Sequence, residues 1–225
     1  SSTDADANDI SITASTGNIE IDTVTTVGSA SDVTIEATAG SILDSVGADS
    51  TITAQVLTLT AATGIGVIGG QAIGTTAESI TASTTDTSQG DIALNESDAV
   101  TLSSVTTNDG SIEVTAGNTI TVTTVTAVDN ASDETMNVSL TSTNGNIALG
   151  SVTAPDDVQL SAASGDITGT GGGLNITSDT LDLSAQANIG SITTFATPAG
   201  DSIEIDVNTI DNLSTSAAGD IYIEQ

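Results

Sequence analysis

One short motif recurs along the whole chain: a glycine, then Asn, Asp or Ser, then an isoleucine that starts an alternating apolar run. Clear copies begin at Gly17, Gly40, Gly90, Gly110, Gly145, Gly165 and Gly219, and weaker copies begin at Gly64, Ala187 and Gly200. Most neighbouring copies are separated by 20 to 26 residues. A repeat of this length, with one turn signal per copy, is typical of a solenoid in which each repeat forms one coil.

Each glycine follows a second run in which apolar residues alternate with Thr, Ser or Asp. Examples lie at 10–17, 33–40, 57–64, 138–145 and 158–165. Such alternation predicts a strand with one buried face. Gly followed by Asn, Asp or Ser suits a tight corner, because glycine tolerates positive φ and the polar side chain bonds to nearby backbone. One coil therefore consists of a strand, a glycine corner, a strand and a variable polar segment, often with a third short strand, as at 24–27.

These features predict an all-β fold: a right-handed parallel β-helix (β-solenoid) of about ten coils of roughly 20–24 residues, with uncapped ends. No window shows the apolar stripe of an amphipathic helix. A β-sandwich built from hairpins is the alternative, but it does not require the same corner every twenty-odd residues. The predicted domain is a single continuous solenoid over 1–225, with a loop excursion at 126–137. The segments 64–74, 169–173 and 187–219 do not define a strand register.

The cadence VxLxAxxG[DNS]IxL, seen for example in VQLSAASGDI at 158–167, resembles the repeats of filamentous-haemagglutinin-like exoproteins and large bacterial surface adhesins. The resemblance covers nearly the whole chain. It implies a right-handed parallel β-helix on the outside of a cell, and therefore an extracellular or cell-surface location.

Charge excludes several classes of partner. The chain has 30 acidic side chains and no Lys, Arg, His or Cys. Nucleic acid is excluded, because phosphate binding depends on Lys and Arg, and anionic membrane surfaces are disfavoured for the same reason. No apolar run approaches the roughly 20 residues of a membrane helix, so no membrane insertion is expected. The predicted partners are copies of the chain itself, head to tail, and cations from solvent.

Composition also argues against an enzyme. The candidate carboxylate pairs for acid–base chemistry, Asp156 with Asp157 and Asp133 with Glu134, are sequence neighbours in loops and fit solvated surface charge better. The many Ser and Thr hydroxyls have no His or Lys to activate them. We therefore predict no catalytic residue, no cofactor and no enzymatic activity.

The polar residues at the glycine corners are candidate metal ligands. Asn18, Asp91, Asn146, Asp166 and Asp220 take the same corner position in the motif, so stacking could place some of them in a column that attracts Ca²⁺. The alternative is that these side chains bond to their own backbone, with stacked Asn amides forming ladders. We predict no specific metal-binding residue, and Ca²⁺ or other cations only as diffuse or inter-coil counter-ions.

Thr-x-Thr pairs occur at 51–53, 58–60, 119–123 and 124–126. A regular array of such pairs on a flat β-helix face can bind ice. The pairs do not recur once per coil in the sequence, so no continuous array is expected.

The preferred function is therefore structural: a subunit or segment of an extracellular fibre, sheath or stalk that stacks head to tail into a filament. The alternative is an adhesin rod that displays a receptor- or surface-binding loop, with 126–137 as the candidate. The last residues from Gly219 and the first residues up to Gly17 together amount to one coil. We therefore expect either a longer repetitive chain or copies that complete a coil between them.

Salt is expected to raise the melting temperature of the rod. The acidic side chains are stacked at a coil spacing of about 4.8 Å, and their repulsion opposes the compact state unless it is screened. Circular dichroism melts from low salt to roughly 1 M NaCl, with divalent cations and mild acid as further conditions, measure the effect. A melting temperature that does not respond to ionic strength would contradict the prediction.

Overall fold

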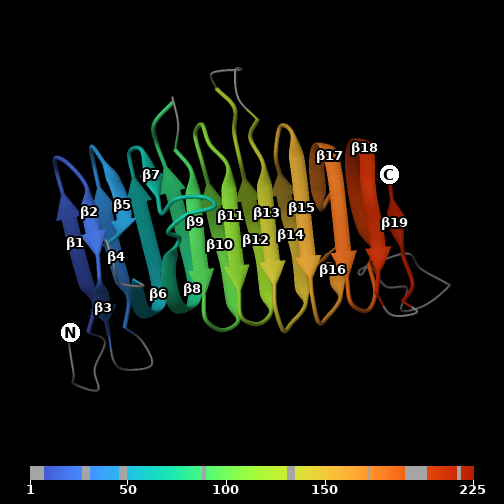
Figure 1. Cartoon of the computed structure of the whole chain (residues 1–225), viewed down its shortest axis with the longest axis horizontal. Coiled ribbons are helices and arrows are strands. Elements are labelled where there is room, and N and C mark those ends of the chain that lie inside the picture. Colours follow the sequence, from blue (N-terminus) through green and yellow to red (C-terminus); the bar gives the residue numbers. More distant parts are fainter. Residues whose placement is uncertain are drawn as a thin grey trace.

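The chain forms a single parallel β-solenoid with no helix in the part of it that is described (Figure 1). The computed structural model describes residues 8–26, 31–45, 50–87, 90–130, 135–171, 173–190, 202–216 and 219–225. Its strands are β1 (Ile10–Ala14), β2 (Ile19–Ile21), β3 (Thr23–Thr25), β4 (Val33–Ala37), β5 (Ser41–Asp44), β6 (Thr51–Ala61), β7 (Gly64–Ile65), β8 (Ile73–Thr84), β9 (Ile92–Glu96), β10 (Val100–Thr106), β11 (Ile112–Ala116), β12 (Ile120–Thr126), β13 (Val138–Ser142), β14 (Ile147–Thr153), β15 (Asp157–Ala162), β16 (Ile167–Gly169), β17 (Ile176–Ala185), β18 (Ile203–Thr215) and β19 (Ile223–Glu224). The alternating runs predicted as strands from the sequence contain β1, β4 and β13 and overlap β6 and β15, so those predictions are confirmed.

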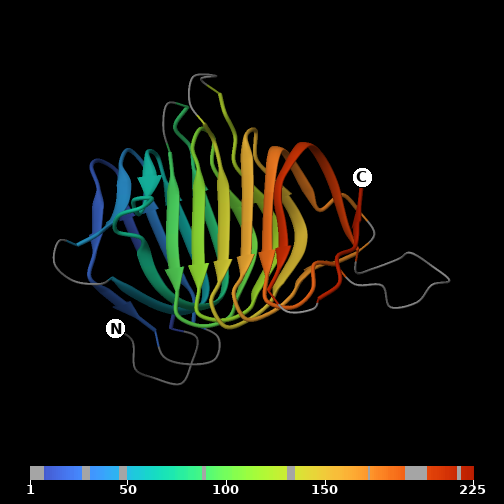
Figure 2. The same cartoon turned by 45° about the vertical axis from the view of Figure 1, so that its right-hand side comes forward.

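Every pairing between these strands is parallel, and each strand lies beside its equivalent in the next coil. One side of the solenoid runs β1, β4, β6, β8, β10, β12, β14, β17, β18, which is eight steps and therefore about eight turns. Figures 1 and 2 show these coils stacked in sequence order from one end of the molecule to the other. The predicted parallel β-solenoid is thereby confirmed.

The coil count is slightly lower than the ten predicted. Equivalent positions are 20 residues apart from Leu102 to Val122, but 27 apart from Val122 to Leu149 and 29 apart from Ile176 to Ile205. The longer coils contain the segment between β12 and β13 and the segment between β17 and β18. Counting one coil for each motif copy overlooked these insertions.

The interior is filled by columns of aliphatic side chains, one from each coil. One column consists of Val33, Leu57, Ile80, Leu102, Val122 and Leu149, and another consists of Ile42, Ile65, Ile92, Ile112, Val138, Val158 and Leu181. All of these side chains are fully or almost fully buried. The period-two alternation places them inward and their Thr, Ser and acidic neighbours outward.

The solenoid has two main outer surfaces, the A face and the B face. The A face is the outer surface of residues 57–61, 80–84, 102–106, 122–126 and 149–153, which stack directly on one another. The B face is the outer surface of β9, β11, β13, β15 and residues 180–185 of β17. In the first three coils a third surface is added by β3 and the first parts of β6 and β8.

The structure places parts of the segments without a predicted register, whose residues 172, 191–201 and 217–218 lie outside the described part of the chain. Residues 66–72 connect β7 to β8, with positive φ at Gly66 and Gly69. Within 187–219, Ile189 bridges Ile167 and Ile221 in parallel, and β18 pairs with β17. The segment predicted as an excursion lies between β12 and β13, and its residues 131–134 are outside the described part of the chain.

The motif glycines serve a different purpose from the one predicted. Among the clear motif copies, only Gly17 has positive φ. At the others except Gly90, where Thr84 is the nearest obstacle, a side chain would collide with the preceding coil: a Cβ on Gly110 would lie 2.6 Å from the carbonyl carbon of Gly90, and one on Gly165 would lie 2.5 Å from the carbonyl oxygen of Gly145. Glycine is required there because the backbones of two coils approach closely at the corner.

Replacing Gly110 by Ala is therefore expected to destabilise the solenoid by roughly 1–3 kcal/mol, because all three nearest atoms belong to rigid backbone. Gly173→Ala is the matched control, since a Cβ there meets nothing within 4 Å and its φ is not positive. Urea unfolding of both variants measures the difference. Equal stability of Gly110→Ala and Gly173→Ala would show that close approach does not explain the corner glycine.

Candidate functional site

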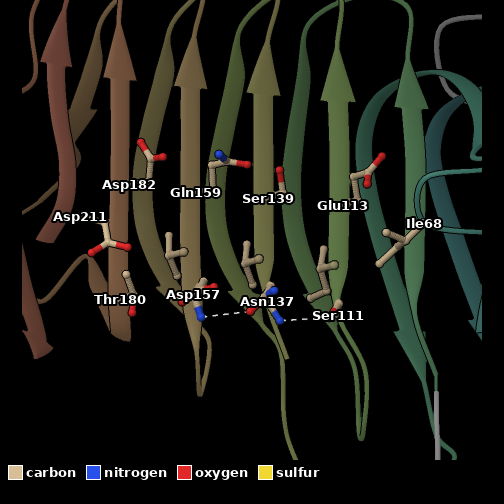
Figure 3. A pocket seen from close by; sticks show the side chains of 13 residues that line it. Ile68, Ser111, Glu113, Asn137, Ser139, Asp157, Gln159, Thr180, Asp182 and Asp211 are labelled. Carbon is tan, nitrogen blue, oxygen red and sulfur yellow. Dashed lines mark hydrogen bonds between the residues drawn. The ribbon is translucent and has the colours of Figure 1, made fainter. Parts of the chain in front are cut away.

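A hollow lies on the B face (Figure 3). It has a volume of about 390 Å³ and is bordered by Ile68 from the 66–72 connection. Its polar lining consists of Ser111, Glu113, Asn137, Ser139, Asp157, Gln159, Thr180, Asp182 and Asp211. These residues come from successive coils, so the hollow is a shallow groove that crosses the strands.

One row of the groove is a column of corner side chains that connects the coils. The Ser111 amide donates to Asp91 Oδ1 at 2.8 Å, and the Asn137 amide donates to Ser111 Oγ at 3.0 Å. The Asp157 amide in turn donates to Asn137 Oδ1 at 3.1 Å. Figure 3 shows the last two of these bonds running along the rod. The column therefore satisfies backbone amides at the corner, and these acceptor atoms already have a donor.

The second row points away from the rod. Glu113, Ser139, Gln159 and Asp182 occupy equivalent positions in four successive coils, and Asp211 lies beside them (Figure 3). Asp182 Oδ1 accepts a bond from Asn212 Nδ2 at 2.8 Å. The row offers carboxylate, amide and hydroxyl oxygens and no cationic group. It suits a cation or a neutral, hydroxyl-rich molecule and repels an anion.

The five corner residues considered for metal binding do not form one column. Asn18 and Asp91 belong to the corner before the B-face strands, where Asn18 Oδ1 accepts the Ser41 amide at 3.0 Å. Asn146, Asp166 and Asp220 belong to a different corner, before β14, β16 and the Ile221 bridge. The prediction of one shared corner was therefore wrong. The motif changes corner within the long coil between Gly110 and Gly145.

This second column has the same chemistry as the first. The Asp166 amide donates to Asn146 Oδ1 at 2.9 Å, and the Asn188 amide donates to Asp166 Oδ1 at 2.8 Å. Asn188 Nδ2 donates to the same Asp166 oxygen at 2.8 Å, and the Asp220 amide donates to Asn188 Oδ1 at 3.0 Å. These side chains therefore bond to the backbone of the next coil and not, as the alternative had predicted, to their own backbone. No cluster of three acidic ligands suited to a metal ion occurs among the described residues.

The candidate acid–base pair is not assembled. Asp156 Oδ2 accepts the Met136 amide at 2.8 Å and lines a separate hollow beside Thr126 and Thr153, whereas Asp157 lines the B-face groove. Asp156 lies in the bend before β15 and Asp157 is the first residue of β15, and the two carboxylates line different hollows. The other pair, Asp133 and Glu134, lies outside the described residues.

One buried carboxylate, Glu96, was not singled out from the sequence. Glu96 is 1% exposed and ends β9 at an inward position. It accepts bonds from Thr75 Oγ1 at 2.8 Å, from the Ala77 amide at 2.9 Å and from the Asp98 amide at 3.0 Å. The alternation Ile92, Leu94, Glu96 could have located it. Its full set of donors makes it a connector between coils rather than a reactive group.

Thr-x-Thr pairs do not recur in every coil, as expected, but mixed pairs of Thr and Ser do form a continuous array. On the A face, outward pairs of hydroxyl residues stack in five successive coils: Thr58 and Thr60, Thr81 and Ser83, Ser104 and Thr106, Thr124 and Thr126, Ser151 and Thr153. The pattern was hidden because Ser replaces Thr in three coils and because the register shifts between Leu102 and Ser104.

Comparisons with protein-family models, with curated proteins and with solved structures found no match to this chain. The resemblance to filamentous-haemagglutinin-like exoproteins accordingly stays a prediction from the sequence. In the described part of the chain, no helix is long and apolar enough to cross a membrane.

Loss of a corner acceptor is expected to destabilise the rod. Asp166→Ala removes two hydrogen bonds to a charged group and is expected to cost roughly 1–3 kcal/mol. Asp166→Asn keeps a side-chain oxygen and is expected to cost less than about 1 kcal/mol. Urea unfolding in roughly 1 M salt, where charge effects are screened, measures both.

The control for this experiment is Asp206→Ala, which removes the same charge from an exposed position on β18. If Asp206→Ala and Asp166→Ala had the same effect, net charge rather than corner bonding would account for the loss.

Proposed function

We propose that this chain is a structural β-solenoid segment of an extracellular or cell-surface fibre, sheath or stalk. The observation that carries the proposal is the stacking of about eight coils through continuous aliphatic columns and through two columns of corner side chains. A rod needs only uniform coils that stack on one another. Its stability comes from contacts between neighbouring coils, so such a rod is extensible.

The interactions between coils favour this role. The strands of each coil form backbone hydrogen bonds with the strands of the next coil. The corner side chains accept further hydrogen bonds from backbone amides of the next coil. A further coil, whether from a longer chain or from another copy, would find the same set of donors and acceptors. We propose head-to-tail continuation in one of these two forms, with cations from solvent as counter-ions and without enzymatic activity.

The proposal is tested on fibres isolated from the natural source. We expect threads of constant width in electron micrographs, and fibre diffraction with a strong repeat of about 4.8 Å along the thread axis. The mass of the denatured polypeptide then separates a continuous chain from stacked copies of 22.0 kDa. Single particles with the length of about eight coils, found without any thread, would contradict the proposal.

The B-face groove favours a second candidate function, an adhesin rod that binds a surface glycan. Its oxygen-rich rows, bordered by Ile68, form a groove that a uniform rod does not need. Binding of the purified chain to neutral glycans, abolished by Gln159→Ala, would favour this alternative. The loop at 126–137 contains no aromatic or basic residue that could act as an anchor.

A further inference from the structure

The A face differs from the B face in its charge. The strand segments that form it, from 57–61 to 149–153, contain no carboxylate at all, and their outward positions are Thr or Ser in five successive coils. The outward positions of the B face, by contrast, include Glu113 and Asp182. In a chain with 30 acidic and no basic side chains, this uncharged surface requires an explanation.

We propose that the A face is the contact surface for a second copy of this chain, so that two rods lie side by side with their A faces together. Elsewhere two copies would bring carboxylates together without any cationic partner, which opposes association. On the A face this repulsion is absent. The inference rests on the proposed fibre function, because lateral contact is how parallel rods would form a thicker thread.

The geometry of the A face suits such a contact. Two copies have the same spacing between coils, so a match between one pair of coils is repeated along the whole length of both rods. The outward Thr and Ser side chains are half-buried by their neighbours in the stack. They form a surface of methyl and hydroxyl groups with little relief. Sheets with small side chains can pack face to face at about 10 Å and interdigitate.

The size and the border of the face determine the strength of the contact. Five strand segments at about 4.8 Å, each of five residues at about 3.3 Å, give roughly 400 Å² per copy. The total of roughly 800 Å² is below the area of a standard stable interface. The adjacent hollow is lined by Asp129, Asp156 and Asp179 beside Thr126 and Thr153, so carboxylates border the face.

Two consequences follow for association. A single pair of segments associates weakly, and only when salt or divalent cations screen the bordering carboxylates. In a fibre with many segments the same contact is repeated, and the association becomes strong through multivalency.

The test compares two double variants that add the same charge. Ser104→Glu with Ser151→Glu places two carboxylates on the A face, and Ser139→Glu with Ser184→Glu places two on the B face, in each case two coils apart. Circular dichroism first establishes that both variants fold. Sedimentation equilibrium and small-angle X-ray scattering then follow association of the 225-residue chain as NaCl or CaCl₂ is raised.

We expect the unmodified chain and the B-face variant to pair at high salt, with an increased cross-sectional radius of gyration. The A-face variant should pair at least about tenfold more weakly. Equal weakening in both variants, or no pairing of the unmodified chain in any salt, would overturn the proposal. Inhibition of ice growth by a chain that stays single would also overturn it, because the hydroxyl array would then have a different ligand.

The scattering profile separates this inference from the proposed function. End-to-end stacking increases the length of the particle at constant cross-section, whereas pairing through the A face increases the cross-section. Long particles of single width would overturn the lateral contact and leave the fibre proposal intact. Single particles that neither lengthen nor thicken would overturn the lateral contact and also contradict stacking of separate copies.

Discussion

The parallel backbone hydrogen bonding between coils is the constraint on which the rest of this structure depends. Each coil must lie directly above the last at about 4.8 Å, so every position along a coil has neighbours in the coils before and after it. Close approach at the corners then requires glycine at positions such as Gly110 and Gly165. The same spacing arranges Ile, Leu and Val in continuous buried columns and makes corner Asn, Asp and Ser side chains the nearest acceptors for amides of the next coil.

Backbone amide groups partly compensate the negative charge of the carboxylates, a role that basic side chains have in other proteins. Asp91, Asp166 and Glu96 each accept hydrogen bonds from amide groups, and Glu96 does so in a buried position. Hydrogen bonds to a charged acceptor are stronger than those between neutral groups. Carboxylates at the corners therefore contribute to stacking even though their charges repel one another. This explains how a solenoid can be stable without a single Lys or Arg.

The sequence was sufficient to predict the strands, their parallel stacking and the inward columns, because alternation and a recurring corner are local signals that every coil repeats. It was insufficient where two arrangements satisfy the same local signal. A glycine followed by Asn or Asp fits either of two corners, so Asn18 and Asp166 look equivalent in sequence but lie in different columns. Likewise, the hydroxyl array at Thr81, Ser104 and Thr124 depends on a register shift that no single strand reveals.

The length dependence of the charge repulsion bears on whether such a chain can extend into a fibre. At physiological ionic strength the screening length is about 8 Å, which is less than two coil spacings of about 4.8 Å. A carboxylate therefore interacts mainly with carboxylates in its own coil and in the adjacent ones. Core packing and backbone bonding are also limited to neighbouring coils. Both the stabilising and the destabilising contributions consequently grow in proportion to the number of coils. If one coil added to the stack lowers the free energy, every further coil does so by a similar amount, and the acidic composition sets no upper limit to the length of the rod.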